Sequence, residues 1–287
     1  MSPIIFALIT FFGWGAGEVL AAITSRKIGS YSLTFWEYVI TLVLSSFYLP
    51  FVLHNISHLT PYLLLLTLLL GVVFLIATVT YYEALRVGNP SLIVTIVFSF
   101  SALVVIFSVI FLKETLVIKQ IFSMILIFLG LFLSSFDFQL LSKDKISPDK
   151  GILLAFLAMF LYAIYFTFIK IPVQSIGWFL PTYIGLLLFP LVSFFANTQK
   201  IKIRGPNFKN VFLLLLGTIL LLRLGDFSYN VAVDTGLTAI VAPIAGASPI
   251  LSSFLAFLIF KEPLKKQQIL GIITTLAGIV LLSFFSA

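Results

Sequence analysis

Apolar runs of about twenty residues, separated by short polar breaks, follow one another along the whole chain. A helix that crosses a bilayer needs about 20 apolar residues, so each run is long enough to span a membrane. Helix is the expected conformation because an isolated strand would leave backbone groups unpaired in lipid. The pattern predicts ten spans, near 4–24, 33–53, 62–83, 91–111, 117–136, 151–171, 178–196, 208–232, 237–260 and 267–285.

The composition favours an all-α integral membrane protein. Of the 287 residues, 61% are apolar and 9% are charged, whereas soluble domains carry about 25% charged residues. The first run has no basic segment before it and is too long for a signal peptide, so we expect a permanent helix. We expect a multi-pass protein of a prokaryotic inner membrane, with the lipid bilayer as its partner.

The basic residues indicate how the chain is oriented. Loops after odd-numbered spans carry thirteen Lys and Arg residues, and loops after even-numbered spans carry three. The positive-inside rule therefore places the odd-numbered loops in the cytoplasm and both termini outside. Because the net charge of +7 arises in these short loops, binding to nucleic acid is not expected.

The sequence contains two copies of one unit. The stretch YYEALRVGNPSLIVTI at 81–96 aligns with YNVAVDTGLTAIVAPI at 229–244, an offset of 229 − 81 = 148 residues. The same offset carries LKETL at 112–116 onto FKEPL at 260–264 without a gap. This registration indicates a duplication.

The duplication predicts the domain organisation. The first five-helix repeat covers 1–136, a polar linker covers 137–150, and the second five-helix repeat covers 151–287. Because five is odd, the second copy should enter the membrane in the opposite sense. Inverted repeats are typical of secondary transporters, whose substrate site lies at the repeat interface near the midplane.

Three features resemble the EamA-type transporters of the drug/metabolite transporter superfamily. They are the GWG in the first span, the aromatic–Ala–small–Gly stretch that closes the third and eighth spans, and the pairs Lys113-Glu114 and Lys261-Glu262. The resemblance implies a secondary transporter of small metabolites, often an exporter, with a central cavity and no cofactor. We interpret the Lys-Glu pairs as anchors at the span boundaries.

Glu18 lies inside the first span, where a charge costs about 2.5–3.5 kcal/mol on insertion scales. It should therefore face a cavity, find a partner or be protonated. Trp14 and Glu18 share one helix face, while Gly13 and Gly17 form a GxxxG pattern suited to close packing. We expect Glu18 to line the transport route and to be a candidate proton carrier; a structural hydrogen bond and interfacial exposure are the alternatives.

The eighth span carries a second polar face, because Arg223, Asp226 and Asn230 follow helical spacing. Arg223 could hold an anionic group of the substrate through its planar fork of donors. Alternatively, Arg223 and Asp226 neutralise each other and are structural. The offset of 148 places Phe166, Leu75 and Thr78 opposite Glu18, Arg223 and Asp226, so the charges belong to one copy only.

Two further acids are weaker candidates. Glu37 lies near the start of the second span and could reach the interface rather than the cavity. Glu83 lies near a span end, and we expect it to pair with Arg86 or Lys27.

Aromatic residues and prolines complete the predicted site. Among the aromatics, Tyr81, Tyr82, Tyr162 and Tyr165 lie on the third and sixth spans, whose counterparts line the cavity in the resembling family. Pro243 and Pro249 should kink the ninth span and allow gating. Their counterparts, Thr95 and Ser101, lack the ring, so we expect the two halves to bend unequally.

His54 and His58 have a spacing that could bind a metal on a helix, but no third ligand is near in sequence, and we expect a polar loop and no metal site. The residues contain no ATP-binding motif and no paired acid or nucleophile–base motif, so neither an ATPase nor an enzyme is expected.

The sequence supports a leading hypothesis and alternatives. The leading hypothesis is an exporter of amino acids or similar zwitterions, in which Glu18 and Arg223 meet opposite charges on a small-molecule substrate. The second hypothesis is an exporter of lipophilic cations, in which Glu18 alone matters and Arg223 is structural. A non-transporting scaffold remains a third hypothesis, and a monomer is compatible with all three.

Overall fold

The computed structural model describes residues 2–88, 90–135, 150–205, 211–260 and 265–286. These residues form fifteen α-helices and one 3-10 helix, and no strand is present among them. The helices are α1 (Pro3–Ile28), α2 (Ser30–Ser46), α3 (Leu49–Val52), η1 (Leu53–His58), α4 (Pro61–Val87), α5 (Pro90–Phe98), α6 (Phe100–Phe111), α7 (Ile118–Ser135), α8 (Lys150–Phe168), α9 (Lys170–Ile176), α10 (Leu180–Leu186), α11 (Phe189–Thr198), α12 (Phe212–Thr235), α13 (Thr238–Gly246), α14 (Pro249–Phe260) and α15 (Lys266–Phe284).

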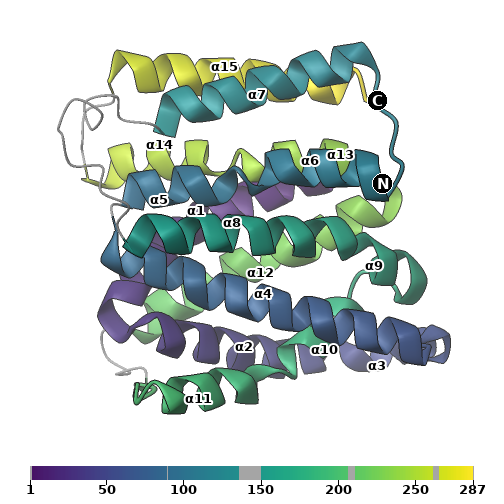
Figure 1. The fold of residues 1–287 in the computed structure, drawn as a ribbon, viewed down its shortest axis with the longest axis vertical. Helices are drawn as coiled ribbons and strands as arrows, with labels where there is room; N and C mark the ends of the chain where they lie inside the picture. Colours follow the sequence, from purple (N-terminus) through teal and green to yellow (C-terminus); the bar gives the residue numbers. More distant parts are fainter. Residues whose placement is uncertain (1, 89, 136–149, 206–210, 261–264, 287) are drawn as a thin grey trace.

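The long helices lie roughly side by side along one common direction (Figure 1). The pair α7 and α15 forms one edge of the bundle, and α11 lies at the opposite edge. Both chain termini lie at the same end, which we call the terminal end. The helices α1, α4, α8 and α12 occupy the middle and carry most of the buried core.

The all-helical class predicted from the sequence is confirmed, whereas the count of ten spans is not. Eight segments of the described chain are long and apolar enough to cross a membrane. In place of the second predicted span, 33–53, the structure has the helices Ser30–Ser46 and Leu49–His58, which are bent by 68° and would together make a ninth. The helix Ile118–Ser134 is apolar but shorter than the others.

The fourth and ninth spans are interrupted at equivalent places. The first copy breaks at Ser99, between α5 and α6, and the second breaks at Ala247–Ser248, between α13 and α14. Since 99 + 148 = 247, the break belongs to the repeated unit and does not require Pro249, which only begins α14. In the first copy the Ser99 hydroxyl donates to the Thr95 carbonyl at 2.8 Å and so competes with the helix ladder.

The equivalent helices α7 and α15 run antiparallel. A side chain at Gly130 would meet Thr275, whereas one at Gly278 would meet Ile127 and Ser123. The residue numbers fall along one helix as they rise along the other. This antiparallel packing is the arrangement expected of two copies with opposite sense.

Glycines allow α1 and α12 to pack closely. A Cβ atom at Gly13 would lie 2.7 Å from the Leu221 carbonyl oxygen and 2.9 Å from the Gly225 nitrogen, so only glycine fits there. The Thr10 hydroxyl donates to the Gly225 carbonyl at 3.1 Å. The GxxxG pattern of the first span therefore has the packing role predicted for it, and it holds Trp14 against the polar part of α12.

Glu114 joins the first copy to the second. Its carboxylate accepts hydrogen bonds from the backbone nitrogens of Thr238 and Ala239, at 2.9 and 2.8 Å. It also pairs with Lys170 at 2.7 Å, and both side chains are buried. A carboxylate at a helix N-terminus satisfies unpaired donors and complements the helix dipole. Glu114 thus serves as an anchor; Lys261-Glu262 lie outside the described residues.

We predict that Glu114→Ala destabilises the protein, because it leaves the Lys170 charge without a counter-charge and two buried backbone donors without their acceptor. Breaking a buried ion pair costs about 3–5 kcal/mol. Thermal unfolding of the purified protein in detergent measures the effect.

The matched control is Arg86→Ala, which breaks the more exposed pair with Glu83 and should cost about 0–1 kcal/mol. The double variant Glu114→Gln, Lys170→Met removes both charges of the pair. It should recover part of the stability that Glu114→Ala loses. Equal unfolding temperatures for Glu114→Ala and Arg86→Ala would contradict the anchor role.

Candidate functional site

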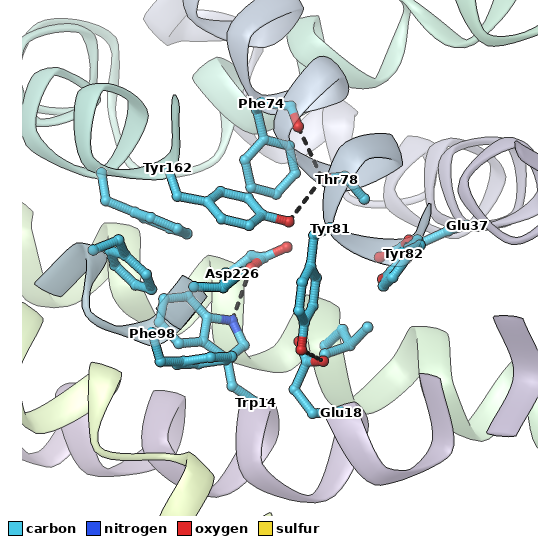
Figure 2. Close-up of a pocket in the computed structure, with 14 residues that line it drawn as sticks. Trp14, Glu18, Glu37, Phe74, Thr78, Tyr81, Tyr82, Phe98, Tyr162 and Asp226 are labelled. Carbon is cyan, nitrogen blue, oxygen red and sulfur yellow. Dashed lines mark hydrogen bonds between the residues drawn. The ribbon is translucent and has the colours of Figure 1, made fainter. Parts of the chain in front are cut away.

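A small cavity lies between helices of both copies in the middle of the bundle (Figure 2). Its free volume is about 40 Å³, room for roughly three water molecules. We call it the central cavity. It is lined by Trp14, Glu18, Glu37, Phe74, Thr78, Tyr81, Tyr82, Val97, Phe98, Phe100, Tyr162, Phe166, Leu222 and Asp226.

Glu18 lines this cavity and has one hydrogen-bond partner among the described residues. The Tyr81 hydroxyl donates to Glu18 Oε2 at 2.6 Å, and Figure 2 shows the two side chains meeting end to end. Within the described chain no Lys or Arg forms an ion pair with Glu18. It is therefore an acid inside the membrane-spanning region with a neutral partner and an open side.

Arg223 lies beside the cavity and is bound by two acids. Its Nη2 donates to Glu37 at 2.5 Å, and its Nη1 donates to Asp226 at 2.7 Å. The three side chains are 6%, 3% and 13% exposed, respectively. The Tyr82 hydroxyl donates to Glu37 at 3.1 Å, and the Trp14 indole donates to Asp226 at 2.9 Å. We call Glu37, Arg223 and Asp226 the ion triad.

The expectation that Glu37 reaches the membrane interface is wrong. The second helix begins at Ser30, earlier than the hydropathy pattern suggested, so Glu37 lies two turns inside it. There it is buried and paired with Arg223. Glu83 does pair with Arg86, at 2.6 Å, as one of the two predicted partners.

Three predicted substrate-binding residues do not line the central cavity: Arg223 lies beside it in the ion triad, and Asn230 and Tyr165 also lie outside it. Asn230 donates its amide to the Trp178 carbonyl at 2.9 Å and to the Thr182 hydroxyl at 2.7 Å, so it joins α12 to α10 and the turn before it. Tyr165 lines a neighbouring void of about 10 Å³ together with Arg223. The structure thus places Asn230 in helix packing and Tyr165 beside the ion triad.

The remaining predicted residues are placed as follows. The side chains of Tyr81, Tyr82 and Tyr162 line the central cavity. Pro243 lies inside α13, and Pro249 is the first residue of α14. His54 and His58 lie on the exposed η1 helix, and the described residues contain no group of three potential metal ligands.

Many residues that line the central cavity are related by the repeat offset of 148. Eight lining residues form four pairs separated by 148 positions, and both members of each pair face the same space. The cavity therefore lies where the two copies meet, as in transporters built from repeats. The pairs are Trp14 with Tyr162, Glu18 with Phe166, Phe74 with Leu222, and Thr78 with Asp226.

The hydrogen bonds at the cavity are also duplicated. Two donors in each copy reach an acceptor at the equivalent position of its partner helix, although the residue types differ. The two donors of the first copy reach ionisable acceptors, and the two donors of the second copy reach a hydroxyl and a carbonyl. The equivalent bonds are Trp14 to Asp226 and Tyr162 to Thr78, and Tyr81 to Glu18 and Tyr229 to the Phe166 carbonyl.

Sequence reasoning missed the phenylalanine part of the wall. Trp14 lies 5.0 Å from Phe166, 5.6 Å from Tyr229 and 6.2 Å from Phe100, measured between ring centroids. The offset already marked Phe166 as the counterpart of Glu18, and treating it as a lining residue would have identified it. Stacked aromatic faces can hold an organic cation through their ring quadrupoles.

These features define the class of the protein as a helical, multi-pass integral membrane protein with a polar cavity at the interface of two repeats. The model of the EamA-like transporter family matches residues 1–136 and 149–284. The chain belongs to the EamA-like transporter family, as the sequence resemblance predicted. This is a family of transporters rather than enzymes.

The fold is also found in solved structures. One chain, titled "Crystal structure of protein", superposes with a TM-score of 0.79 over 99% of this chain and 96% of that chain, at 13% identity. At this identity the likeness shows the fold alone. No curated protein sequence gave a significant match.

We predict that Arg223→Met destabilises the protein strongly, because it leaves two buried carboxylates side by side without a cation. The expected loss is about 3–5 kcal/mol. The triple variant Glu37→Gln, Arg223→Met, Asp226→Asn removes all three charges and should recover most of the loss. Thermal unfolding in detergent measures both, and a triple variant no more stable than Arg223→Met would argue against the ion triad as a mutually neutralised unit.

Proposed function

We propose that this member of the EamA-like family is a secondary transporter of organic cations with an apolar or aromatic body, and that Glu18 is the counter-ion. The proposal rests on one observation, an acid in the central cavity that has no cationic partner within the described chain. Within the described cavity Glu18 is the one acid without a cationic partner, and it lies beside a largely aromatic wall. A desolvated amine or quaternary cation would satisfy that carboxylate.

The charge inventory supports a cationic substrate. The central cavity is lined by three carboxylates, and two of them share one guanidinium. With all groups ionised, the net charge is 1 − 3 = −2. In a medium of low dielectric constant this excess attracts a cation and repels an anion.

The contacts of Arg223 disfavour the amino-acid hypothesis. Both ends of its donor fork are occupied by Glu37 and Asp226. Its third nitrogen, Nε, is buried without a partner, and the void beside Arg223 has about 10 Å³, too little for a substrate carboxylate. A zwitterion would have to break the ion triad, whereas a cation would not. The contacts therefore favour the second hypothesis made from the sequence.

Glu18 also offers a means of energy coupling. A carboxylate that binds either a proton or a cation exchanges one for the other as the cavity faces each side in turn. No ATP-binding motif is present in the sequence, so we propose proton–cation exchange in the direction of export. The basic loops at the end opposite the termini favour an orientation with the termini outside.

The central cavity is contracted in this conformation. Its free volume of about 40 Å³ is far below the 300–1,000 Å³ usual for small-molecule sites. Substrate binding must therefore separate helices of the two copies. The interrupted spans, α5–α6 and α13–α14, cross at this level through Gly246 and Ser101, and we propose that they allow this movement.

We predict that Glu18→Gln abolishes transport while the protein stays folded. Uptake of radiolabelled tetraphenylphosphonium into proteoliposomes with an imposed pH gradient measures it. The rate should fall below about one-tenth of the wild-type rate, because the amide cannot neutralise the cation. Tyr81→Phe should keep part of the activity, since the carboxylate remains.

Glu83→Gln is the matched control, because this acid lies on α4 outside the cavity and pairs with Arg86; its transport should be normal. Unlabelled quaternary amines should compete for uptake, and amino acids should not. Competition by amino acids alone, or normal transport by Glu18→Gln, would contradict the proposed function.

A further inference from the structure

A second, larger cavity lies at the terminal end of the bundle. Its free volume is about 450 Å³, within the range of small-molecule sites. Its walls come from α1 and α7 of the first copy and from α9, α12 and α13 of the second. Gln174 and Thr235 are exposed at its rim, so it reaches the surface. We call it the terminal vestibule.

The vestibule contains one uncompensated charge among its described lining residues. Lys170 is neutralised by Glu114 at 2.7 Å and also donates to the Gly236 carbonyl at 2.9 Å. Asp234 is half-buried, and its carboxylate has no ion pair or hydrogen bond within the described chain. Counted together with Glu114, which lies behind Lys170, the vestibule has a net charge of 1 − 2 = −1, and the unpaired charge is on Asp234.

The surroundings of Asp234 favour a cation further. Asp234 lies in the last turn of α12, where the helix dipole is negative and cations are stabilised. The Gln174 amide nitrogen already donates to the Asp234 carbonyl at 3.4 Å, which leaves its side-chain oxygen as an acceptor. An apolar wall that includes Ile240 and Ile244 lies on the other side, as an amine with an apolar body requires.

The vestibule and the central cavity lie in line along the same two helices. On α12, Asp226 lines the central cavity and Asp234 lines the vestibule, about 12 Å apart along the helix axis. On α1, Trp14 lines the first and Ala7 the second. The two acids therefore mark successive positions on one path toward the terminal end.

An aromatic partition separates the two spaces. Tyr229, fully buried, lies on α12 between the two acids and stacks on Trp14 with ring centroids 5.6 Å apart. Its hydroxyl is held by the Phe166 carbonyl at 2.9 Å. In this conformation the vestibule is large enough for a ligand, whereas the central cavity is not.

We propose that the terminal vestibule is a second binding site for organic cations, with Asp234 as the counter-ion, occupied when the substrate passes between the central cavity and the terminal side of the membrane. This proposal rests on the cationic substrate proposed above. It adds a second binding site to the one at Glu18, and transport through Glu18 alone would not need it.

The test counts the sites with tetraphenylphosphonium as the probe. Equilibrium dialysis of the purified full chain in detergent, corrected for binding to empty micelles, should find two sites in the wild type. Glu18→Gln should remove one site, and Asp234→Asn should remove the other. Asp234→Glu, which keeps the charge, should retain both, and Glu83→Gln, at an acid that lines neither cavity, is the matched control.

Transport kinetics give a second readout that a merely structural role would not produce. Asp234→Asn should raise KM for tetraphenylphosphonium roughly tenfold with kcat unchanged, because it weakens capture but not the central step. Asp234→Glu should restore the wild-type KM. Unfolding temperatures show that each variant is folded.

The outcomes separate the two proposals. One site in the wild type, lost in Glu18→Gln and unchanged in Asp234→Asn, would overturn the vestibule site and leave the proposed function standing. Loss of a site in Asp234→Asn, with Glu18→Gln unaffected, would support the vestibule and refute the role of Glu18. Two sites that neither variant changes would overturn both.

Discussion

A charge inside the membrane needs a partner, a polar cavity or a proton, and the central part of this structure depends on that requirement. Arg223 is held by Glu37 and Asp226, and these acids are held in turn by Tyr82 and Trp14. The ion triad thereby fixes α2, α12, α4 and α1 relative to one another. With both neighbouring acids engaged, Glu18 is left as the acid that a mobile cation or proton can reach.

The repeat explains how such an arrangement can arise without a new fold. The frame is duplicated down to individual hydrogen bonds, since Tyr162 reaches Thr78 just as Trp14 reaches Asp226. One copy of each bond is neutral and supports only the packing. In the equivalent bond the acceptor is an acid, and the same bond geometry places the charge of that acid at the space between the copies. The two copies thus share their hydrogen-bond geometry and differ in the side chains at equivalent positions.

Hydropathy and the offset of 148 predict the helical class and the two copies, and the cost of an unpaired charge in lipid predicts that Glu18 faces a cavity, where the structure places it. The helical spacing offered the pair of Arg223 with Asp226 as one alternative, and the two side chains do pair. The second partner, Glu37, could not be predicted, since it lies 186 positions away and meets Arg223 only after packing. The phenylalanine walls were hidden for a different reason. The chain has 32 phenylalanines, and this residue suits lipid, core and cavity equally, so only the repeat offset singles one out.

Trp14 connects the charge network to the path between the two cavities. It stacks on Tyr229 in the partition and donates its indole hydrogen to Asp226, so the partition cannot open by moving Trp14 unless that bond breaks. A hydrogen bond to a charged group contributes about 1.5–3 kcal/mol, which keeps an empty cavity closed. A cation bound in the central cavity can satisfy the Asp226 oxygen in place of the indole. If the protein transports cations as proposed, opening would then be easier when the cavity is occupied than when it is empty, and an empty transporter would not leak.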